Sequence, residues 1–412
     1  MKNVVEGNSE LRIGKLNKLF EDYFGDQKKH LFSSPGRIEI AGNHTDHNNG
    51  HVVAAAINLE SLAIVSKTSD MEVNFISTNL DQHIKLNLNN VKIIADECGK
   101  TSSLIRGIAA KFVEIDYNVG GFNCVVQSEV AIGSGLSSSA SIEILVGEIF
   151  NYFYNQDKIG PIELAKIGQY AENVYFGKPC GLMDQLAIAY GGIIGIDFLD
   201  FENPKVLPIA AELTLFDYSF VIVNTGGSHA DLTDDYAAIP KEMNKIAKYF
   251  EKKSLRFVSR NILMENISDL RKQFGDRAFL RACHFVEENK RAESIIKLLN
   301  NNDFEGFLQT VNEAGNSSFK WLQNAYSIHD VENQGISLAM ELTENFFKKS
   351  NTLGAVKVHG GGFAGTILTI ISNNFTEEYI EEMAKVFGEK SVTKVSIRNS
   401  GTKFISEIDT IF

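Results

Sequence analysis

Gly133-Ser134-Gly135-Leu136-Ser137-Ser138-Ser139-Ala140 is the most informative stretch of this 412-residue sequence. Glycines let backbone N–H groups turn toward an anion, because no Cβ stands in the way. Serine hydroxyls donate hydrogen bonds to phosphate oxygens and also serve as ligands of Mg²⁺. The stretch therefore has the composition of a phosphate-binding loop. A flexible surface loop that merely opens a helix is the alternative.

The sequence on both sides of this loop favours phosphate binding. Phe122 to Ser128 alternates like a strand, and Ala140 to Phe153 has a helical pattern. The loop is thus expected at a helix N-terminus, where free N–H groups and the helix dipole attract anions. It is not a Walker loop, because it lacks the Gly-Lys-Thr ending. The sequence Gly99-Lys100-Thr101 is a decoy, because Ile94 stands where the Walker spacing needs glycine.

A second polar segment, Asn43 to Gly50, follows a short predicted strand and contains His44, Asp46 and His47. Clustered Asp, Asn and His side chains suit the hydroxyls of a carbohydrate, each of which is both donor and acceptor. A solvated turn and a zinc site are the alternatives. His47 and His51 have helical spacing, but the intervening Asn-Asn-Gly argues against a helix and so against zinc.

Asp184 lies in the otherwise apolar stretch Cys180 to Tyr190. A carboxylate there is costly unless it is paired or hydrogen-bonded. Capping a helix is the common structural role of such an acid. The functional alternative is a base, or an anchor, for a hydroxyl nucleophile. A nearby arginine would keep Asp184 ionised and would also touch a transferred phosphate, but the sequence alone does not place Arg37 beside it.

His359-Gly360-Gly361-Gly362 has the composition of the oxyanion-hole motif of lipases. A hydrolase of that type also needs the nucleophile motif G-x-S-x-G, and the sequence contains none. The alternative is a glycine turn between two strands, predicted at Ala355 to Val358 and Thr366 to Ile371, that brings backbone close to an active site.

The remaining pattern predicts two domains, which suits the length. Leu11 to Phe24 is an amphipathic helix, Ser33 to Gly36 breaks the chain, and Arg37 to Gly42 forms a short strand. Helical, charged segments dominate after about residue 205, so we expect domains at residues 1–205 and 206–412.

Composition narrows the class of protein. The net charge of −12 makes nucleic acid an unlikely partner. The cysteines form no C-x-x-C pair, which argues against structural zinc and disulfides and for a reducing compartment. No apolar segment follows the first residues, and Asn58 and Glu60 interrupt the longest apolar stretch, Val52 to Val65. We therefore expect a cytoplasmic protein without a membrane partner.

Four segments, in order between residues 32 and 366, together resemble one enzyme family. Pro35 to His47 resembles the galactokinase signature P-G-R-x-x-x-x-G-E-H-x-D-Y, and Pro179 to Gln185 resembles a further galactokinase segment. Gly133 to Ser141 and Lys357 to Gly365 resemble two motifs of the wider GHMP kinase superfamily (galactokinase, homoserine, mevalonate and phosphomevalonate kinases). The resemblance implies an α+β, two-domain GHMP kinase fold. Its N-terminal domain is ribosomal-S5-domain-2-like, its C-terminal domain is a ferredoxin-like α/β sandwich, and the active site lies between them.

The resemblance also implies an ATP-dependent sugar kinase that phosphorylates the 1-hydroxyl of galactose, with Mg²⁺, as a monomer or weak dimer. Asp184 and Arg37 match the catalytic positions, and Ser139 and Glu172 match the Mg²⁺-associated positions. The ATP phosphates would lie on Gly133, Ser134, Gly135, Leu136, Ser137, Ser138 and Ser139. The expected sugar contacts are Asn43, His44, Asp46, Gly181, Asp184 and Tyr236.

The sequence departs from the family pattern in four places. The basic residue that usually follows the tyrosine matched by Tyr236 is not at its expected place, since Ala237-Ala238-Ile239-Pro240 follows instead. Asn43 stands where galactokinases usually have a sugar-contacting Glu, His47 replaces Tyr, and Ala131 replaces the Pro before the phosphate loop. The change at Asn43 keeps a hydrogen-bond acceptor but removes a charge. Another sugar 1-kinase acting on a galactose relative is therefore one alternative, and a non-catalytic galactose sensor is a second. Retention of Arg37 and Asp184 argues against the sensor.

Overall fold

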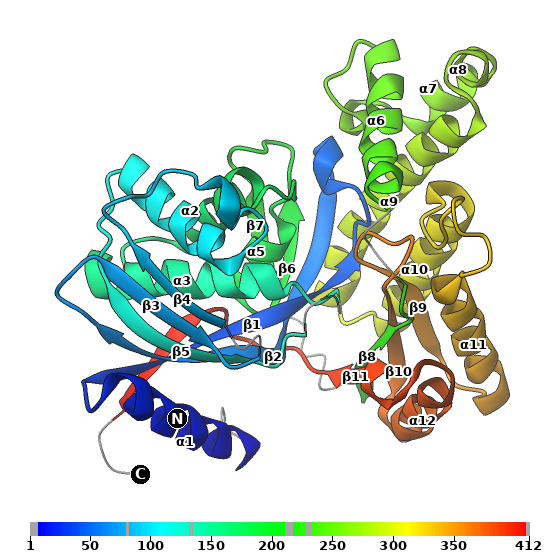
Figure 1. Ribbon diagram of the computed structural model, residues 1–412. Helices are drawn as coiled ribbons and strands as arrows, with labels where there is room; N and C mark the ends of the chain where they lie inside the picture. The colour runs from blue at the N-terminus through cyan, green and yellow to red at the C-terminus, as the bar shows by residue number, and fades with distance from the viewer. Residues whose placement is uncertain are drawn as a thin grey trace.

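The structure is a computed structural model that describes residues 7–79, 82–131, 133, 135–210, 217–227 and 232–408. Within these residues the chain forms one sheet of eight strands and one of four, with helices packed on both (Figure 1).

The larger sheet is built mostly from the first half of the chain. Its strands are β1 (Lys29–Ala41), β2 (His51–Lys67), β3 (Glu72–Ser77), β4 (Gln82–Asn87), β5 (Phe122–Ser128), β6 (Ile193–Asp197), β7 (Lys205–Ile209) and β12 (Lys403–Ile408). The order is β12-β1-β2-β5-β3-β4, and β6 pairs with both β2 and β7. Only β3 and β5 run parallel among these pairs.

Helices cover both faces of the larger sheet. They are α1 (Gly7–Phe24) on one face, and α2 (Thr101–Glu114), α3 (Ser138–Asn155), α4 (Pro161–Tyr170) with its π-helical continuation η3 (Ala171–Phe176), and α5 (Met183–Tyr190) on the other. Side chains alternate along β2, as a strand buried on both faces requires. Leu62 and Ile64 pack with α1, whereas Ala63 and Val65 pack with α2 and α3.

The smaller sheet belongs to the second half of the chain. Its strands are β8 (Tyr218–Asn224), β9 (Gly354–His359), β10 (Thr366–Ser372) and β11 (Val392–Val395), in the antiparallel order β11-β8-β10-β9. One face packs on α11 (Gly335–Ser350) and α12 (Thr376–Phe387). The other face packs on α9 (Asp276–Asn300) and α10 (Phe304–Ser317) in a core that also contains Ile38 and Ile40 of β1. This shared core fixes the two sheets to each other.

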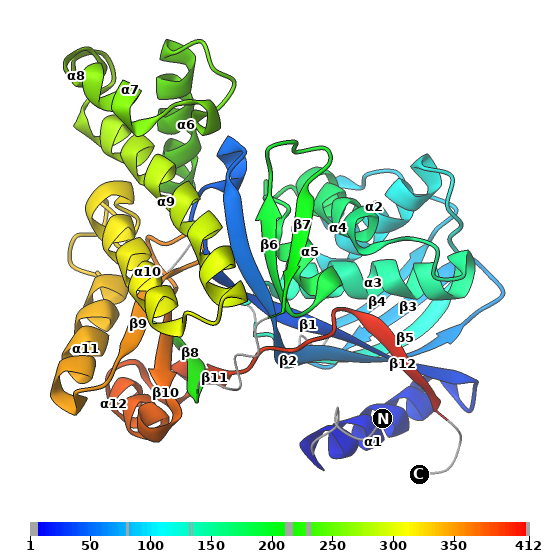
Figure 2. The same cartoon turned by 180° about the vertical axis from the view of Figure 1, so that it is seen from behind.

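The remaining helices complete the second half. The helices α6 (Thr233–Tyr249), α7 (Arg260–Glu265) and α8 (Ile267–Phe274) pack on the first turns of α9, at the end of the molecule away from α1 (Figure 2). Short helical turns are η1 (Asp46–Asn48), η2 (Ala95–Glu97), η5 (Leu255–Phe257), η6 (Ser318–Leu322), η7 (Asn373–Phe375) and η8 (Glu389–Ser391).

The last strand crosses back to the larger sheet. Figure 2 shows β12 beside β1, and the pairing runs from Lys29 with Ile408 to Ser33 with Lys403. The strand β7 also joins this sheet, through β6. The boundary expected after residue 205 stays a prediction, but both ends of the second segment, 206–412, reach the larger sheet.

The expected chain break at Ser33 to Gly36 is wrong, because these residues lie within β1, a single strand of 13 residues. Pro35 donates no hydrogen bond, so a proline is tolerated only where one side of a strand needs no donor. The pairing with β12 ends at Ser33, and the pairing with β2 shifts register between Pro35 and Arg37. The shift in register therefore accommodates Pro35 within one continuous strand.

Two further features bear on the class of protein. Cys98, Cys124, Cys180 and Cys283 are all free thiols. Across the described part of the chain, none of the helices has the length and the apolar character that crossing a bilayer requires.

Candidate active site

The glycine-serine loop connects β5 to the N-terminus of α3, as the sequence predicts. Gly133 and Gly135 have φ values of 74° and 73°, in the region that favours glycine. Gly135 also lies against the smaller sheet, since a Cβ there would stand 2.5 Å from Oγ1 of Thr366. The loop therefore needs glycine both for its conformation and for its approach to β10. Ser134 lies outside the described residues.

The rest of the loop is tied to three elements. Leu136 is buried, and its carbonyl accepts the N–H of Arg37 at 3.1 Å. Ser137 donates its hydroxyl to the Asp184 carboxylate, and Ser138 is the first residue of α3. Ser139 donates to Oε1 of Glu172 at 2.9 Å. From Gly135 to Ser139, each residue of the loop thus lies beside a predicted catalytic or metal-associated residue, or at the helix N-terminus.

Arg37 and Asp184 form a two-pronged ion pair across 147 positions of sequence. Nε and Nη2 of Arg37 each lie 2.6 Å from a carboxylate oxygen of Asp184, and Nη1 donates to the Gly135 carbonyl. Burial raises the pKa of Asp184, but the charge and hydrogen bonds of Arg37, with the Ser137 hydroxyl, outweigh it and hold the pKa below its ordinary value. Asp184 is in the first turn of α5 but caps nothing there.

Asp46 and Gly181 extend this cluster. Burial raises the pKa of Asp46 to about 6, and the charges of Glu39 and Asp184 act in the same direction. A Cβ on Gly181 would overlap Oδ2 of Asp46. Gly181 is therefore a glycine because the Asp46 carboxylate occupies the space beside it, and the first polar loop meets the α5 segment here.

Replacing Gly181 by alanine is expected to raise the KM for the sugar substrate predicted from the sequence about ten-fold, which corresponds to about 1.4 kcal/mol. The added methyl must displace the Asp46 carboxylate, whereas the phosphate loop is left in place. Steady-state kinetics with varied sugar and saturating ATP measure this. Gly14→Ala is the control, because nothing lies within 4 Å of its Cβ position. An unchanged KM would show that Asp46 does not contact the sugar.

The glycine turn between β9 and β10 receives hydrogen bonds from three predicted sugar-contacting residues. Each donates to a successive carbonyl, in the pairs Asn43 Nδ2 to Gly360 at 2.7 Å, His44 Nε2 to Gly361 at 2.9 Å, and Tyr236 Oη to Gly362 at 2.9 Å. The Tyr236 ring also fills the space where Gly361 lacks a Cβ. The polar loop of the larger sheet and α6 are thus joined to the smaller sheet at the predicted sugar site.

Asn43 is almost fully engaged by protein groups and is 1% exposed. Its Nδ2 also donates to Oε1 of Glu39 at 3.0 Å, and its Oδ1 accepts from Asn324 at 2.8 Å. Glu39 in turn forms a buried ion pair with Lys357, with 2.7 Å between Nζ and Oε1. The Glu39 carboxylate is therefore hydrogen-bonded to the residue at position 43, where the family pattern has a glutamate.

His359 does not belong to an oxyanion hole. The N–H of Glu39 donates to Nε2 of His359 at 3.0 Å, so the ring proton is on Nδ1, which lies 3.2 Å from Oγ1 of Thr366. Burial lowers the pKa of His359 well below its ordinary value, and the charges of Arg37 and Lys357 add to this. The glycines after it form the turn between the antiparallel strands β9 and β10, so the turn interpretation is confirmed.

Ser139 and Glu172 offer two adjacent oxygen ligands, and Lys178 lies 3.1 Å from Glu172. Mg²⁺ is usually held by one or two carboxylates together with substrate phosphates and water, so this pair fits Mg²⁺ bound with a nucleotide. No group of three or more His, Cys, Asp or Glu side chains in the described chain is arranged as a metal site. His51 is instead paired with Asp197 at 3.3 Å.

Sequence reasoning missed the acidic group behind the predicted metal ligands. Gln185 donates from one nitrogen to Glu143 at 2.9 Å and to Glu172 at 3.1 Å. Burial and the charge of Glu172 raise the pKa of Glu143 well above its ordinary value. The acid between Ile142 and Ile144, in a largely apolar helical segment, is the sequence signal that could have found it.

Comparison with known proteins identifies the family of this chain. The family description "Galactokinase galactose-binding signature" matches residues 18–67, and "GHMP kinases N terminal domain" matches residues 103–192. The curated galactokinase of Limosilactobacillus reuteri (strain DSM 20016) is 32% identical over 384 residues, which are 90% of this chain and 93% of the relative. The chain belongs to the galactokinase family. The galactokinase of Clostridium tetani is 29% identical, over 97% of this chain and 99% of the relative.

Solved structures confirm the fold. The crystal structure of Lactococcus lactis galactokinase complexed with galactose has a TM-score of 0.81 and 26% identity, covering 96% of this chain and all of that one. A mevalonate kinase has a TM-score of 0.63 at 20% identity, covering 90% of this chain and 99% of that one. The predicted α+β, two-domain GHMP kinase fold is therefore correct. As a galactokinase family member, the protein is a sugar kinase.

Proposed function

We propose that this galactokinase family member transfers the γ-phosphoryl group of ATP to the 1-hydroxyl of D-galactose, giving galactose 1-phosphate and ADP, as in galactose catabolism. The observation that carries the proposal is the Arg37–Asp184 ion pair held against the glycine-serine loop. Phosphoryl transfer depends mainly on alignment and on neutralising charge, and this arrangement supplies both. The names of the curated relatives and the galactose of the Lactococcus lactis complex support the choice of sugar.

In this proposal, Asp184 orients the 1-hydroxyl and accepts its proton as the bond to phosphorus forms. Because Arg37 holds its pKa low, Asp184 is an anion at neutral pH and only a weak base. Orientation and charge are thus its larger contributions. Arg37, which Asp184 holds in place, stabilises the negative charge on the phosphoryl group in flight.

The backbone of Gly133 to Ser139 and the N-terminus of α3 are proposed to hold the ATP phosphates. Ser139 and Glu172 are proposed to hold Mg²⁺. When bound with ATP, Mg²⁺ would neutralise negative charge on the phosphates, which a chain of negative net charge does not neutralise as a whole. Lys178, beside Glu172, adds a positive charge at the same place.

Replacing Glu172 by Gln is expected to raise the Mg²⁺ concentration needed for half-maximal activity about ten-fold or more, since loss of even an indirect metal contact has such an effect. Titrating Mg²⁺ at constant ATP measures this, and EDTA should abolish activity in both proteins. Glu265→Gln, an exposed acid on α7, serves as the control. Equal Mg²⁺ requirements in Glu172→Gln and wild type would remove Glu172 from the metal site.

The sugar is proposed to contact His44, Asp46, Gly181, Asp184 and Tyr236. Asn43 completes the set predicted from the sequence. Its amide is held by Glu39, Gly360 and Asn324, so we propose that it acts mainly by fixing the polar loop against the glycine turn.

The raised pKa of Asp46 gives sugar binding a pH dependence. A carboxyl with a pKa of about 6 is mostly ionised at pH 7 and mostly protonated at pH 5. Only the ionised form accepts hydrogen bonds with both oxygens, so kcat/KM for the sugar should fall about ten-fold per pH unit below pH 6. A pH profile between pH 4.5 and 8 measures this. In Asp46→Asn that acid limb should vanish at a lower overall kcat/KM; a limb that persists there belongs to another group.

The test of the proposed function is ADP release from ATP and Mg²⁺ in the presence of a panel of sugars. Turnover with galactose above all others is the expected result. Turnover only with an amino sugar, a uronic acid or L-arabinose would establish the alternative of another sugar 1-kinase, which the uncharged Asn43 favours. Galactose binding without turnover of any sugar would establish the sensor.

We also propose that the protein works in the cytoplasm as a monomer or weak dimer, without nucleic acid or membrane as partner. Its acidic charge and the composition described above support this. Sedimentation at several protein concentrations tests the oligomeric state.

A further inference from the structure

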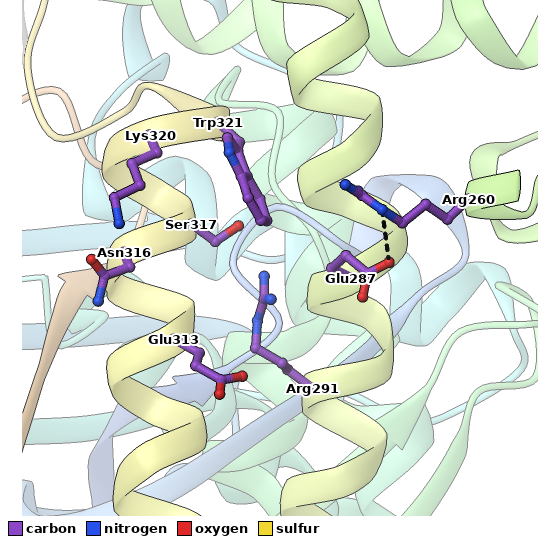
Figure 3. A pocket seen from close by; sticks show the side chains of 8 residues that line it. All are labelled: Arg260, Glu287, Arg291, Glu313, Asn316, Ser317, Lys320 and Trp321. Carbon is purple, nitrogen blue, oxygen red and sulfur yellow. Dashed lines mark ion pairs between the residues drawn. The ribbon is translucent and has the colours of Figure 1, made fainter. Parts of the chain in front are cut away.

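A pocket of about 580 Å³ lies between α9 and α10 and beside α7, away from the candidate active site. Its residues come from elements other than the glycine-serine loop and the sugar loop. Figure 3 shows Arg291 projecting from α9 so that its guanidinium lies between the two helices, below Ser317 and Trp321. The pocket has the size of a small-molecule site, which is about 300–1,000 Å³.

The wall of this pocket contains a buried hydrogen-bond donor without a partner, on an arginine whose Nε is paired with Glu288. Nη2 of Arg291 is buried without a hydrogen-bond partner, although most buried donors in proteins have one. Arg260 lies over the ring of Trp321, with 5.7 Å from Cζ to the ring centroid. Lys320 is exposed at the rim. Three cations thus surround one space, and an anion there would receive charge-assisted hydrogen bonds.

Two acids, Glu287 and Glu313, line the pocket, and a third, Glu288, lies outside its lining and is paired with Arg291 at 2.7 Å. Glu287 is shared between Arg260, at 3.7 Å, and Lys290, at 3.3 Å. Glu313 is exposed at the rim, and the hydrogen bond that it accepts from Gln309 is long, at 3.5 Å. A phosphomonoester, which carries about −1.5 to −2 charges at pH 7, fits three cations better than a carboxylate does.

The other side chains point to a sugar as the organic part. The indole of Trp321, which Arg260 overlies at 5.7 Å, adds apolar surface against which C–H groups of a sugar ring can pack. Asn316 and Glu313, both exposed at the rim, supply donors and acceptors for hydroxyl groups.

This pocket is connected to the sugar loop of the active site by two hydrogen-bonded paths. Nε of Arg291 donates to Glu288 at 2.7 Å, and the other oxygen of Glu288 accepts the N–H of Gly42 at 2.9 Å. In the second path, Ser317 lies 2.8 Å from Nδ1 of His284, whose Nε2 donates to the Asn43 carbonyl at 3.0 Å. Both paths end at the backbone of Gly42 and Asn43.

We propose that this pocket binds a phosphorylated sugar, and that its occupation weakens sugar binding at the active site. A phosphate that pairs with Arg291 draws it away from Glu288. The buried Glu288 carboxylate then loses its compensating charge, and its hydrogen bonds with the N–H groups of Gly42 and Asn43 weaken. The proposed reaction releases such a ligand, galactose 1-phosphate; its identification as the ligand rests on the proposed function.

The position of Trp321 provides a direct readout, because it is the one tryptophan in the sequence. Galactose 1-phosphate, inorganic phosphate and galactose are titrated separately into the full-length protein, and tryptophan emission is followed. Galactose 1-phosphate should give a saturable change, with a Kd at least about ten-fold below that of inorganic phosphate. The variant Arg260→Ala/Lys320→Ala should weaken it at least about ten-fold, whereas Lys297→Ala, an exposed lysine of α9, should not.

Galactose affinity, measured by equilibrium dialysis, tests the coupling. Galactose 1-phosphate should raise the galactose Kd about five-fold in wild type. Most of this rise should be lost in Arg260→Ala/Lys320→Ala, whose kinetics without added product should stay normal. Persistence of the rise would show plain competition at the active site and overturn the coupling. Absence of a saturable emission change, or an equal Kd for galactose 1-phosphate in the double variant, would overturn the site. Equal affinity for inorganic phosphate and galactose 1-phosphate would overturn the sugar part of the proposal.

Neither readout depends on turnover. A protein that released no ADP with galactose would overturn the proposed function but leave both binding measurements interpretable. Failure of the binding measurements would leave the kinase activity as it is.

Discussion

Asp184→Asn should lower kcat by about 10²- to 10⁴-fold while leaving the affinity for ATP within about three-fold. Asparagine has nearly the same shape but carries no charge and cannot accept the proton of the 1-hydroxyl. It also releases Arg37, both of whose contacts with Asp184 are 2.6 Å long. The loop that is proposed to hold ATP keeps its glycines and its helix N-terminus, so nucleotide binding should be spared.

The measurement is steady-state kinetics together with direct titration of an ATP analogue. Asp269→Asn, an exposed aspartate on α8, is the matched control and should behave like wild type. If Asp184→Asn keeps activity within about five-fold of wild type, Asp184 is neither base nor anchor, and the proposed mechanism fails. A large loss of ATP affinity with little change in kcat would instead assign Asp184 to nucleotide binding.

Lys357→Met is expected to lower the free energy of unfolding by about 3–5 kcal/mol, because it leaves the Glu39 carboxylate buried without its partner. The Lys357 side chain is fully buried and that of Glu39 is 5% exposed, so water does not replace the lost charge. Methionine keeps much of the length and packing of the lysine stem. Urea denaturation compares the midpoints of the two proteins.

The double variant Glu39→Gln/Lys357→Met should recover most of the lost stability, since no unpaired charge then remains. Lys348→Met, an exposed lysine on α11, should change stability by less than about 0.5 kcal/mol. A loss below about 1 kcal/mol in Lys357→Met would mean that the Glu39 carboxylate is stabilised by Asn43 rather than by the lysine.

Where neighbouring residues carry the signal, sequence reasoning succeeded. The glycine-serine loop lies between a strand and a helix, and the glycines after His359 form a turn, as expected. The chain break predicted at Ser33 to Gly36 was wrong because of a tertiary feature. Pro35 is accepted in β1 only because β12 no longer pairs with the strand at that position. A local rule cannot know which side of a strand will be paired.

The predicted residue roles remain proposals, but their spatial arrangement could be judged only from the structure. The sequence treats Asn43 as a sugar contact, whereas the fold surrounds its amide with Glu39, Gly360 and Asn324. The carboxylate of Glu39 was not singled out at all, since a strand residue of alternating pattern carries no sign of a buried partner 318 positions away.

The sequence by itself determined the family, the position of the glycine-serine loop between a strand and a helix, and the residue types that the proposed chemistry needs. These depend on short-range properties: glycines that accept positive φ, strand and helix periodicity, and motif spacing. Only the tertiary structure decided which of these groups meet. Arg37 reaches Asp184 across 147 positions and Asn43 reaches Gly360 across 317, because the shared core around Ile38 fixes the two sheets together. Contacts of that separation arise from packing and strand order, which no local pattern encodes.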